Sequence, residues 1–220
     1  AEVDRLRQEK HDNPDPEAAS DPLADALVRF EPRSTPAAPV RVTVPPSALA
    51  DKAGVYRNGR DMRGQRLRVR DGKLETENGL ELVPIDSSGL SYQAARGGSR
   101  IVFSRRRDGH YDGHTVSLTS DTVPVYGVAD ADTTRAALGA YVGGYESPEA
   151  EATLRVAFDS TGALVLTRIS TTGGPWRMRP IYRDGFAIPP GVLVFTRDRS
   201  RITGFRFTTA RVRNLRFDRK

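Results

Sequence analysis

The chain has 220 residues, with 34 lysines and arginines against 28 aspartates and glutamates, for a net charge of +6. It contains no cysteine, which excludes disulfides and thiolate metal sites. No apolar run approaches the roughly 18 residues of a membrane-spanning helix.

The start of the chain carries no secretion signal pattern. It begins at Ala1 without a methionine, which fits signal cleavage, methionine removal or excision from a longer polypeptide.

Residues 1–46 are expected to comprise a polar tail, one short helix and a proline-rich linker. Ser20-Asp21-Pro22 indicates a helix start, because serine caps a helix and proline suits its first turn. An apolar stripe with helical spacing follows, so we expect a helix over about 20–30. Its members are Leu23, Leu27 and Phe30. The five prolines between residues 32 and 46 predict an extended linker.

Residues 47–129 are predicted to form a first β-barrel module. Arg66 to Arg70 alternates strictly between polar and apolar residues, as a half-buried strand does. Asp71-Gly72 predicts a turn, and Asn78-Gly79 is the strongest short hairpin signal in the chain. Further strands are expected around Ile101–Phe103 and Val116–Leu118.

A second β module is predicted over 133–220, because the first is repeated there at an offset of 87 to 96 residues. The repeat begins with three matched positions, where Leu49, Gly54 and Tyr56 of the first copy correspond to Leu138, Gly143 and Tyr145 of the second. The echo continues through Phe103 and Arg105, which match Phe195 and Arg197. A repeat of this length is a duplicated domain rather than one unit of a solenoid.

The predicted fold is all-β, with two tandem small antiparallel up-and-down barrels of lipocalin-like form. Strands of about five residues, with turns every 8–12, are typical of antiparallel sandwiches and barrels. Closure also removes exposed strand edges. Tyr56 and Tyr145 each follow a glycine, which lets the first strand bend, and both are expected to fill the ends of their cores.

The repeat resembles the C-terminal β-barrel domains of penicillin-binding-protein-like serine hydrolases, a family that includes class C β-lactamases, esterases and D-aminopeptidases. The resemblance covers about residues 47–220, and the second copy matches it better. The matching positions there are Leu138, Gly143, Tyr145, Gly162, Leu164, Pro180, Phe186, Phe195, Arg197, Asp198, Gly204 and Phe205. Those of the first copy are Gly54, Tyr56, Gly72, Leu74, Pro84, Phe103, Asp108 and Gly113.

Such hydrolases carry a Ser-x-x-Lys nucleophile motif in a preceding catalytic domain. No lysine of this chain has a serine three positions earlier, and Tyr56-Arg57-Asn58 matches the family's Tyr-x-Asn element only by coincidence. The resemblance therefore implies a non-catalytic accessory part, without a cofactor, that works with a serine hydrolase in cis or in trans. It also favours a periplasmic or secreted location.

The candidate site is a loop in the second copy. Leu164 and Pro180 are 16 positions apart, whereas their counterparts Leu74 and Pro84 are 10 apart. We expect this longer loop to reach the cleft of a partner hydrolase and to shape substrate access. Its candidate binding residues are Thr171, Thr172, Gly173, Gly174, Trp176 and Arg177. For Trp176, a plug in the barrel is the preferred interpretation, and contact with a partner is the alternative.

Two further clusters of polar residues are weaker candidates for a functional site. His110, Asp112 and His114 have the spacing of metal ligands on a strand, but flanking Asp-Gly pairs favour a loop, so no metal site is predicted. Arg105 to Arg107, and the matching Arg197, are expected at solvated strand ends.

Two other functions remain open. The first is a free-standing lipocalin-like protein that binds a small ligand, although apolar inward positions favour a filled interior. The second is a basic nucleic-acid binder, which ranks last because no row of exposed aromatic residues offers a stacking surface.

Overall fold

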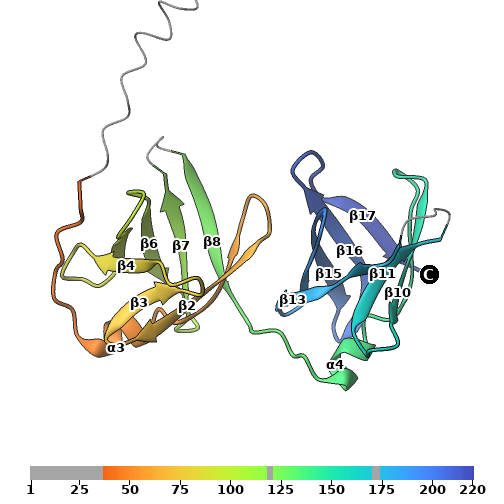
Figure 1. Ribbon diagram of the computed structural model, residues 1–220, viewed down its shortest axis with the longest axis horizontal. Coiled ribbons are helices and arrows are strands. Elements are labelled where there is room, and N and C mark those ends of the chain that lie inside the picture. Colours follow the sequence, from red (N-terminus) through yellow and green to blue (C-terminus); the bar gives the residue numbers. More distant parts are fainter. Residues whose placement is uncertain (1–36, 118–120, 170–173) are drawn as a thin grey trace, which may run out of the picture. The chain divides into compact units, whose positions relative to one another are not determined.

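The computed structural model describes residues 37–117, 121–169 and 174–220 (Figure 1). These residues form two antiparallel β-sheets, one for each predicted module, with few helical residues. The helix predicted at about 20–30 lies outside the described residues. The predicted all-β class and the tandem barrel architecture are confirmed.

The first sheet is a closed barrel of eight strands in which each strand pairs with its neighbours in the sequence, β1 to β8. The circle is completed where β1 pairs with β8, with Val55 opposite Val128. A short helix, α3 (Pro46–Ala50), precedes the barrel. The strands are β1 (Gly54–Asn58), β2 (Gly64–Arg70), β3 (Lys73–Thr76), β4 (Glu81–Pro84), β5 (Ser91–Ala94), β6 (Arg100–Arg105), β7 (Tyr111–Val116) and β8 (Thr122–Val128).

The turns of this barrel follow from the predicted turn residues. Arg70 pairs with Lys73, so Asp71 and Gly72 form a two-residue turn, with φ values of 50° and 71°. Positive φ at both positions gives the turn twist that matches paired strands. Asn78-Gly79 lies between β3 and β4, as predicted. Of the strand expected at Val116–Leu118, Val116 ends β7, and Leu118 lies outside the described residues.

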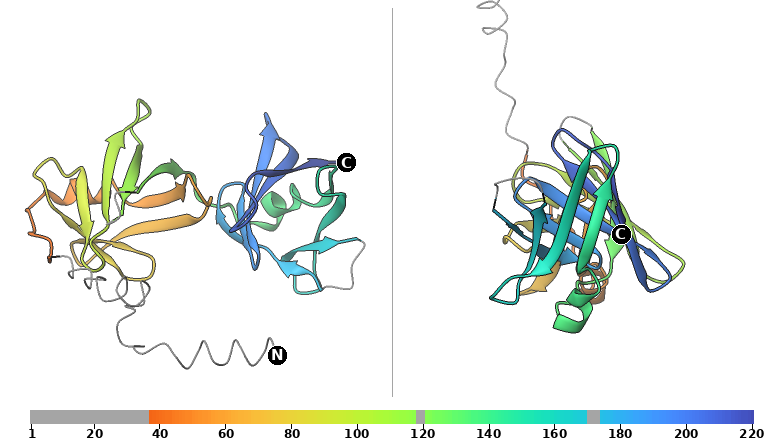
Figure 2. Two further views of the ribbon diagram at one scale, coloured as in Figure 1. Left: turned by 90° about the horizontal axis from the view of Figure 1, so that it is seen from above. Right: turned by 90° about the vertical axis from the view of Figure 1, so that its right-hand side faces the viewer.

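The second sheet is a nearly closed barrel, and Figure 2 shows the strands of each sheet curving around an interior of their own. Helix α4 (Arg135–Gly139) precedes it, and β9 pairs with both β10 and β17. The two edge strands of this sheet are β12 and β13, which are consecutive in the chain. The strands are β9 (Gly143–Ser147), β10 (Ala152–Phe158), β11 (Leu164–Arg168), β12 (Trp176–Arg177), β13 (Arg179–Tyr182), β14 (Gly185–Ile188), β15 (Gly191–Asp198), β16 (Arg201–Thr209) and β17 (Leu215–Arg219).

Both interiors are filled by side chains. In the first barrel, the rings of Tyr56 and Tyr92 pack on Phe103, with centroid distances of 5.4 and 5.6 Å. In the second, Tyr145 packs on Phe195 and Phe205 at 5.7 and 5.0 Å. Edge-to-face and tilted pairs at such distances stabilise a core beyond simple burial. The contact of Tyr56 with Phe103 and that of Tyr145 with Phe195 thus join positions that match in the repeat.

The part of the chain that the structure describes contains no helix with the length and hydropathy of a membrane span.

Candidate functional site

The second barrel has a seam where the chain changes partners. β12 pairs with β11, with Trp176 opposite Leu166, and the backbone N–H of Met178 extends this ladder to the carbonyl of Leu164 at 2.8 Å. From Arg179 onwards the chain pairs instead with β14. β12, Met178 and β13 therefore act as one bent strand. Its first half is hydrogen-bonded to β11 and its second half to β14.

The first barrel has no such change of partners at the equivalent strand. Leu82 of β4 pairs with Leu74 of β3 and with Ala94 of β5 at once. The connection also differs in length, because residues 77–80 join β3 to β4, whereas residues 169–175 join β11 to β12. The predicted loop extension is confirmed, and it coincides with the opening of the seam.

A cleft of about 480 Å³ lies along the seam. Its apolar walls come from α4, from the start of β11 and from the bend of the β12–β13 strand, while the arginines on either side of Met178 are exposed. The lining residues are Thr133, Leu138, Ala163, Leu164, Arg177, Met178, Arg179 and Pro180. Apolar walls with a few charged groups are typical of surfaces that bind a ligand or a partner.

Trp176 does not plug the barrel, so the preferred interpretation of this residue was wrong. The residue is 37% exposed, although its cross-strand partner Leu166 is 1% exposed. The core of the second barrel is already occupied by Tyr141, Phe186 and Phe195, whose rings pack on one another. Because this cluster fills the interior, the indole stays at the surface beside the seam.

The other predicted binding residues separate into two groups. Gly174 and Arg177 are exposed, and Arg177 lines the seam cleft. Thr171, Thr172 and Gly173 lie outside the described residues. Trp176 and Arg177 thus form β12, and of the two Arg177 lines the cleft.

One polar cluster of the second barrel has no clear signal in the sequence. Arg197 donates from Nε to both carboxylate oxygens of Asp184, at 2.8 and 2.9 Å, and Tyr141 donates its hydroxyl to the same carboxylate at 2.8 Å. Burial, together with the hydrogen bond to Asp184, raises the pKa of Tyr141. The side chain of Arg197 is only 21% exposed, so its predicted place at a solvated strand end was wrong.

The first barrel has a different group at the place of Tyr141, which is Lys52 in the repeat. Lys52 is 2% exposed, and its Nζ lies 3.7 Å from the centroid of the Tyr111 ring. Nζ also donates to the carbonyl of Ala48 at 3.4 Å. A cation over an aromatic face is stabilised by the ring's electrons. These two contacts explain how the ammonium group of Lys52 is stabilised although it is buried, and they indicate a structural role for this residue.

The histidines are placed differently from the sequence interpretation. Tyr111 to His114 belong to strand β7, so the predicted loop is wrong there, and His110 precedes the strand. Asp112 accepts a hydrogen bond from the backbone N–H of Gly127 at 2.8 Å. Among the described residues no group of three or more histidines and carboxylates is arranged to hold a metal ion. Arg105 to Arg107 are exposed, as expected.

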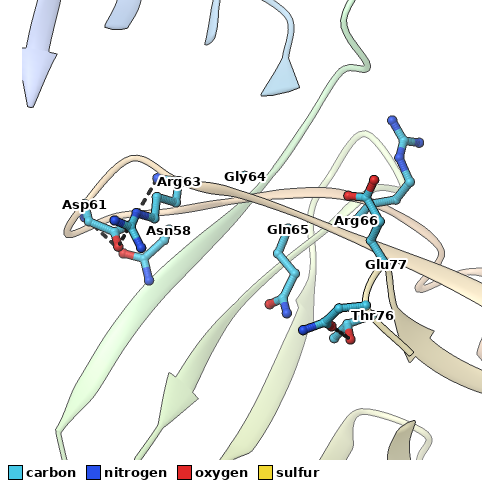
Figure 3. A pocket seen from close by; sticks show the side chains of 9 residues that line it. Asn58, Asp61, Arg63, Gly64, Gln65, Arg66, Thr76 and Glu77 are labelled. Carbon is cyan, nitrogen blue, oxygen red and sulfur yellow. Dashed lines mark hydrogen bonds and ion pairs between the residues drawn. The ribbon is translucent and has the colours of Figure 1, made fainter. Parts of the chain in front are cut away.

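The first barrel carries a concavity of about 500 Å³ between its β1–β2 and β3–β4 turns (Figure 3). Asn58 accepts from the backbone N–H of Asp61 at 3.2 Å, and Asp61 accepts from that of Arg63 at 3.0 Å. Thr76 donates its hydroxyl to Asn78. These side chains stabilise their own turns, so the seam of the second barrel is the stronger candidate site.

No protein-family model and no curated protein sequence matches the chain.

Proposed function

We propose that the two barrels are a non-catalytic accessory pair that works with a penicillin-binding-protein-like serine hydrolase, in cis or in trans. The second barrel contacts the hydrolase through β12 and the seam cleft. It thereby docks the catalytic domain or narrows the entrance to its active site.

The observation that carries this proposal is the exposed Trp176, which precedes the cleft-lining Arg177 on β12. Tryptophan and arginine are the residue types most enriched at energetically important positions of protein interfaces. Trp176 and Arg177 are consecutive on β12, an edge strand of the sheet, where a partner can approach them.

The filled barrel interiors also favour a function in which the outer surface binds a partner, rather than one in which the interior binds a ligand. Small barrels of about eight strands either hold one small ligand or are packed with side chains. Tyr92 and Leu74 of the first barrel and Tyr145 and Leu193 of the second are 0% exposed. Both barrels are therefore built as rigid scaffolds that present surface groups.

The test is affinity capture of the tagged chain from its native extract, followed by labelling of the eluate with a fluorescent fluorophosphonate. A labelled serine hydrolase should co-elute while the chain itself stays unlabelled. Trp176→Ala should abolish co-elution. Tyr126→Ala is the matched control, because Tyr126 is a 39% exposed aromatic residue of β8 in the first barrel.

Two results would overturn the proposal. If wild type captures no labelled hydrolase, the accessory function fails. If the chain's own band is labelled, the chain has a nucleophile and the non-catalytic assignment is wrong.

A second function is favoured by the size of the cleft. About 480 Å³ falls within the range of pockets that hold small molecules. A free-standing small-ligand binder would then use the seam instead of the barrel interior. Titration with the apolar dye 1-anilinonaphthalene-8-sulfonate, read by energy transfer from Trp176, distinguishes the two. Saturable transfer that Leu138→Asp abolishes would favour this function.

A further inference from the structure

The positive charge of the chain is concentrated in the second module. Residues 133–220 contain 15 lysines and arginines but only 7 aspartates and glutamates, a net charge of +8. Residues 47–129 contain 13 and 10, a net charge of +3. Because the modules are duplicates, the excess is a property of the second copy and not of the fold. A strongly basic surface attracts anionic partners.

Much of this charge lies on the β16–β17 hairpin. Between Asp198 and Asp218 the chain has no acidic residue. Four exposed arginines lie on the distal half of the hairpin: Arg206, Arg211, Arg213 and Arg216. β16 and β17 are adjacent strands of the sheet, as Figure 1 shows.

Two of these arginines oppose each other across the strands. Arg206 of β16 is the direct partner of Arg216 of β17. Like charges at such positions destabilise a sheet. Among the described residues, Asp218 is the carboxylate paired with this group, at 2.7 Å from Arg216 Nε, and Arg206 donates to the carbonyl of Asn214 at 3.3 Å. The hairpin thus keeps a charge repulsion that an anionic partner would relieve.

The hairpin tip is held in shape by its own threonines. The hydroxyl oxygen of Thr209 accepts from the backbone N–H groups of Arg211 and Val212, at 3.1 and 3.0 Å. The backbone N–H of Thr209 donates to the carbonyl of Val212 at 2.7 Å. Preorganisation lowers the entropy cost of binding. The tip therefore presents its side chains in a fixed arrangement.

The centre of this basic tip is apolar. Val212 is 42% exposed and lies between Arg211 and Arg213. An aliphatic side chain flanked by cations matches a bilayer surface, where anionic headgroups cover a hydrocarbon layer. A nucleic acid would instead favour exposed rings for stacking. Of the described residues, the large exposed aromatics are Tyr126 and Trp176, which lie on other strands.

We propose that the tip of the β16–β17 hairpin docks on an anionic lipid bilayer. The four arginines contact lipid phosphates, and Val212 enters the boundary between headgroups and acyl chains. The contact is reversible, because each basic residue near an anionic surface adds only a modest increment of affinity.

The test is sedimentation of the whole chain with vesicles of pure phosphatidylcholine, or of phosphatidylcholine and phosphatidylglycerol in equal parts. We expect binding to the anionic vesicles alone. Raising the salt from about 0.1 M to about 1 M should release the chain, since the screening length falls from about 10 Å to about 3 Å.

The variant Arg211→Gln/Arg213→Gln should lower the vesicle partition coefficient on the order of tenfold. Val212→Asn should lower it several-fold without any change in charge. The matched control is Arg105→Gln/Arg107→Gln in the first barrel, which removes the same charge from exposed positions and should leave most of the binding intact. Circular dichroism checks that each variant is folded.

Equal binding to both kinds of vesicle, or equal losses in the hairpin and control variants, would overturn the proposal. So would binding to a short DNA duplex that is stronger than vesicle binding and insensitive to Val212→Asn. That result would identify a nucleic acid as the partner of the basic hairpin.

Discussion

Tyr145 donates its hydroxyl to the backbone carbonyl of Tyr141, four residues earlier, at 2.7 Å. The first barrel repeats the bond, since Tyr56 donates to the carbonyl of Lys52 at 3.1 Å. Each bond ties the segment that follows the short helix to the first strand of its barrel. The bond is thus common to both copies, even though the side chains at positions 52 and 141 differ.

We expect Tyr145→Phe to lower the free energy of unfolding by about 1–2 kcal/mol, because a buried carbonyl loses its hydrogen-bond donor. Tyr56→Phe should have a similar effect on the first barrel. Tyr126→Phe, at a 39% exposed position, should change stability by less than about 0.5 kcal/mol. Urea unfolding followed by circular dichroism measures all three. Equal stabilities would show that the bond contributes nothing.

The tyrosine cores should make the fold sensitive to alkali. Burial raises the pKa of Tyr145 and of Tyr92 to about 12 each. Unfolded tyrosines ionise near pH 10. Between these values the native state retains protons that the unfolded state has released. The contribution of these tyrosines to the free energy of unfolding is therefore constant below about pH 10 and falls as the pH rises towards 12.

Absorbance of tyrosinate near 295 nm, recorded against pH, measures this effect. Loss of native circular dichroism should accompany the late-titrating tyrosines, and Tyr145→Phe should make the fall in stability shallower. Titration of every tyrosine near pH 10 with the fold intact would contradict the expectation.

The ion pair between Arg197 and Asp184 should stabilise the second barrel. Lysine cannot reproduce the forked donors of arginine, which here reach Asp184, Tyr141 and the carbonyl of Ser200. We expect Arg197→Lys to cost about 1–2 kcal/mol. Arg105→Lys, at the duplicate and exposed position, should be neutral within about 0.5 kcal/mol. Thermal unfolding of both variants tests the difference, and equal melting temperatures would refute it.

Trp176 should behave as a surface residue. Its fluorescence should be quenched readily by iodide, because the residue is 37% exposed. We expect Trp176→Ala to cost less than about 1 kcal/mol, whereas removal of a core tryptophan costs about 3–5 kcal/mol. Chemical denaturation distinguishes these cases. A large loss of stability would contradict this expectation and indicate that Trp176 is a core residue.

The strands and turns could be predicted because their signals are local. Alternation over Arg66 to Arg70 and the Asp71-Gly72 pair determine a strand and its turn within a few residues. Closure of the first barrel followed from the number of strands. The duplication then extended the same reasoning to the second module.

The site was only partly predictable, because its contacts join distant positions. The longer loop pointed to the seam, but the change of partners at Met178 depends on backbone hydrogen bonds to Leu164 and β14. The contact between Asp184 and Arg197 likewise depends on the pairing of β14 with β15, which places positions 13 apart in the chain side by side. Trp176 was assigned to the interior because a small barrel needs large side chains, yet the tyrosines and phenylalanines had already filled it.

The most direct test of the accessory function is site-specific photo-cross-linking in the native extract. A benzophenone amino acid is placed at position 176 in one variant and at position 126 in another. We expect the first to yield a cross-linked product that carries the fluorophosphonate label of a serine hydrolase, and the second to yield none. Labelled products from both positions, or from neither, would contradict a hydrolase contact at the seam.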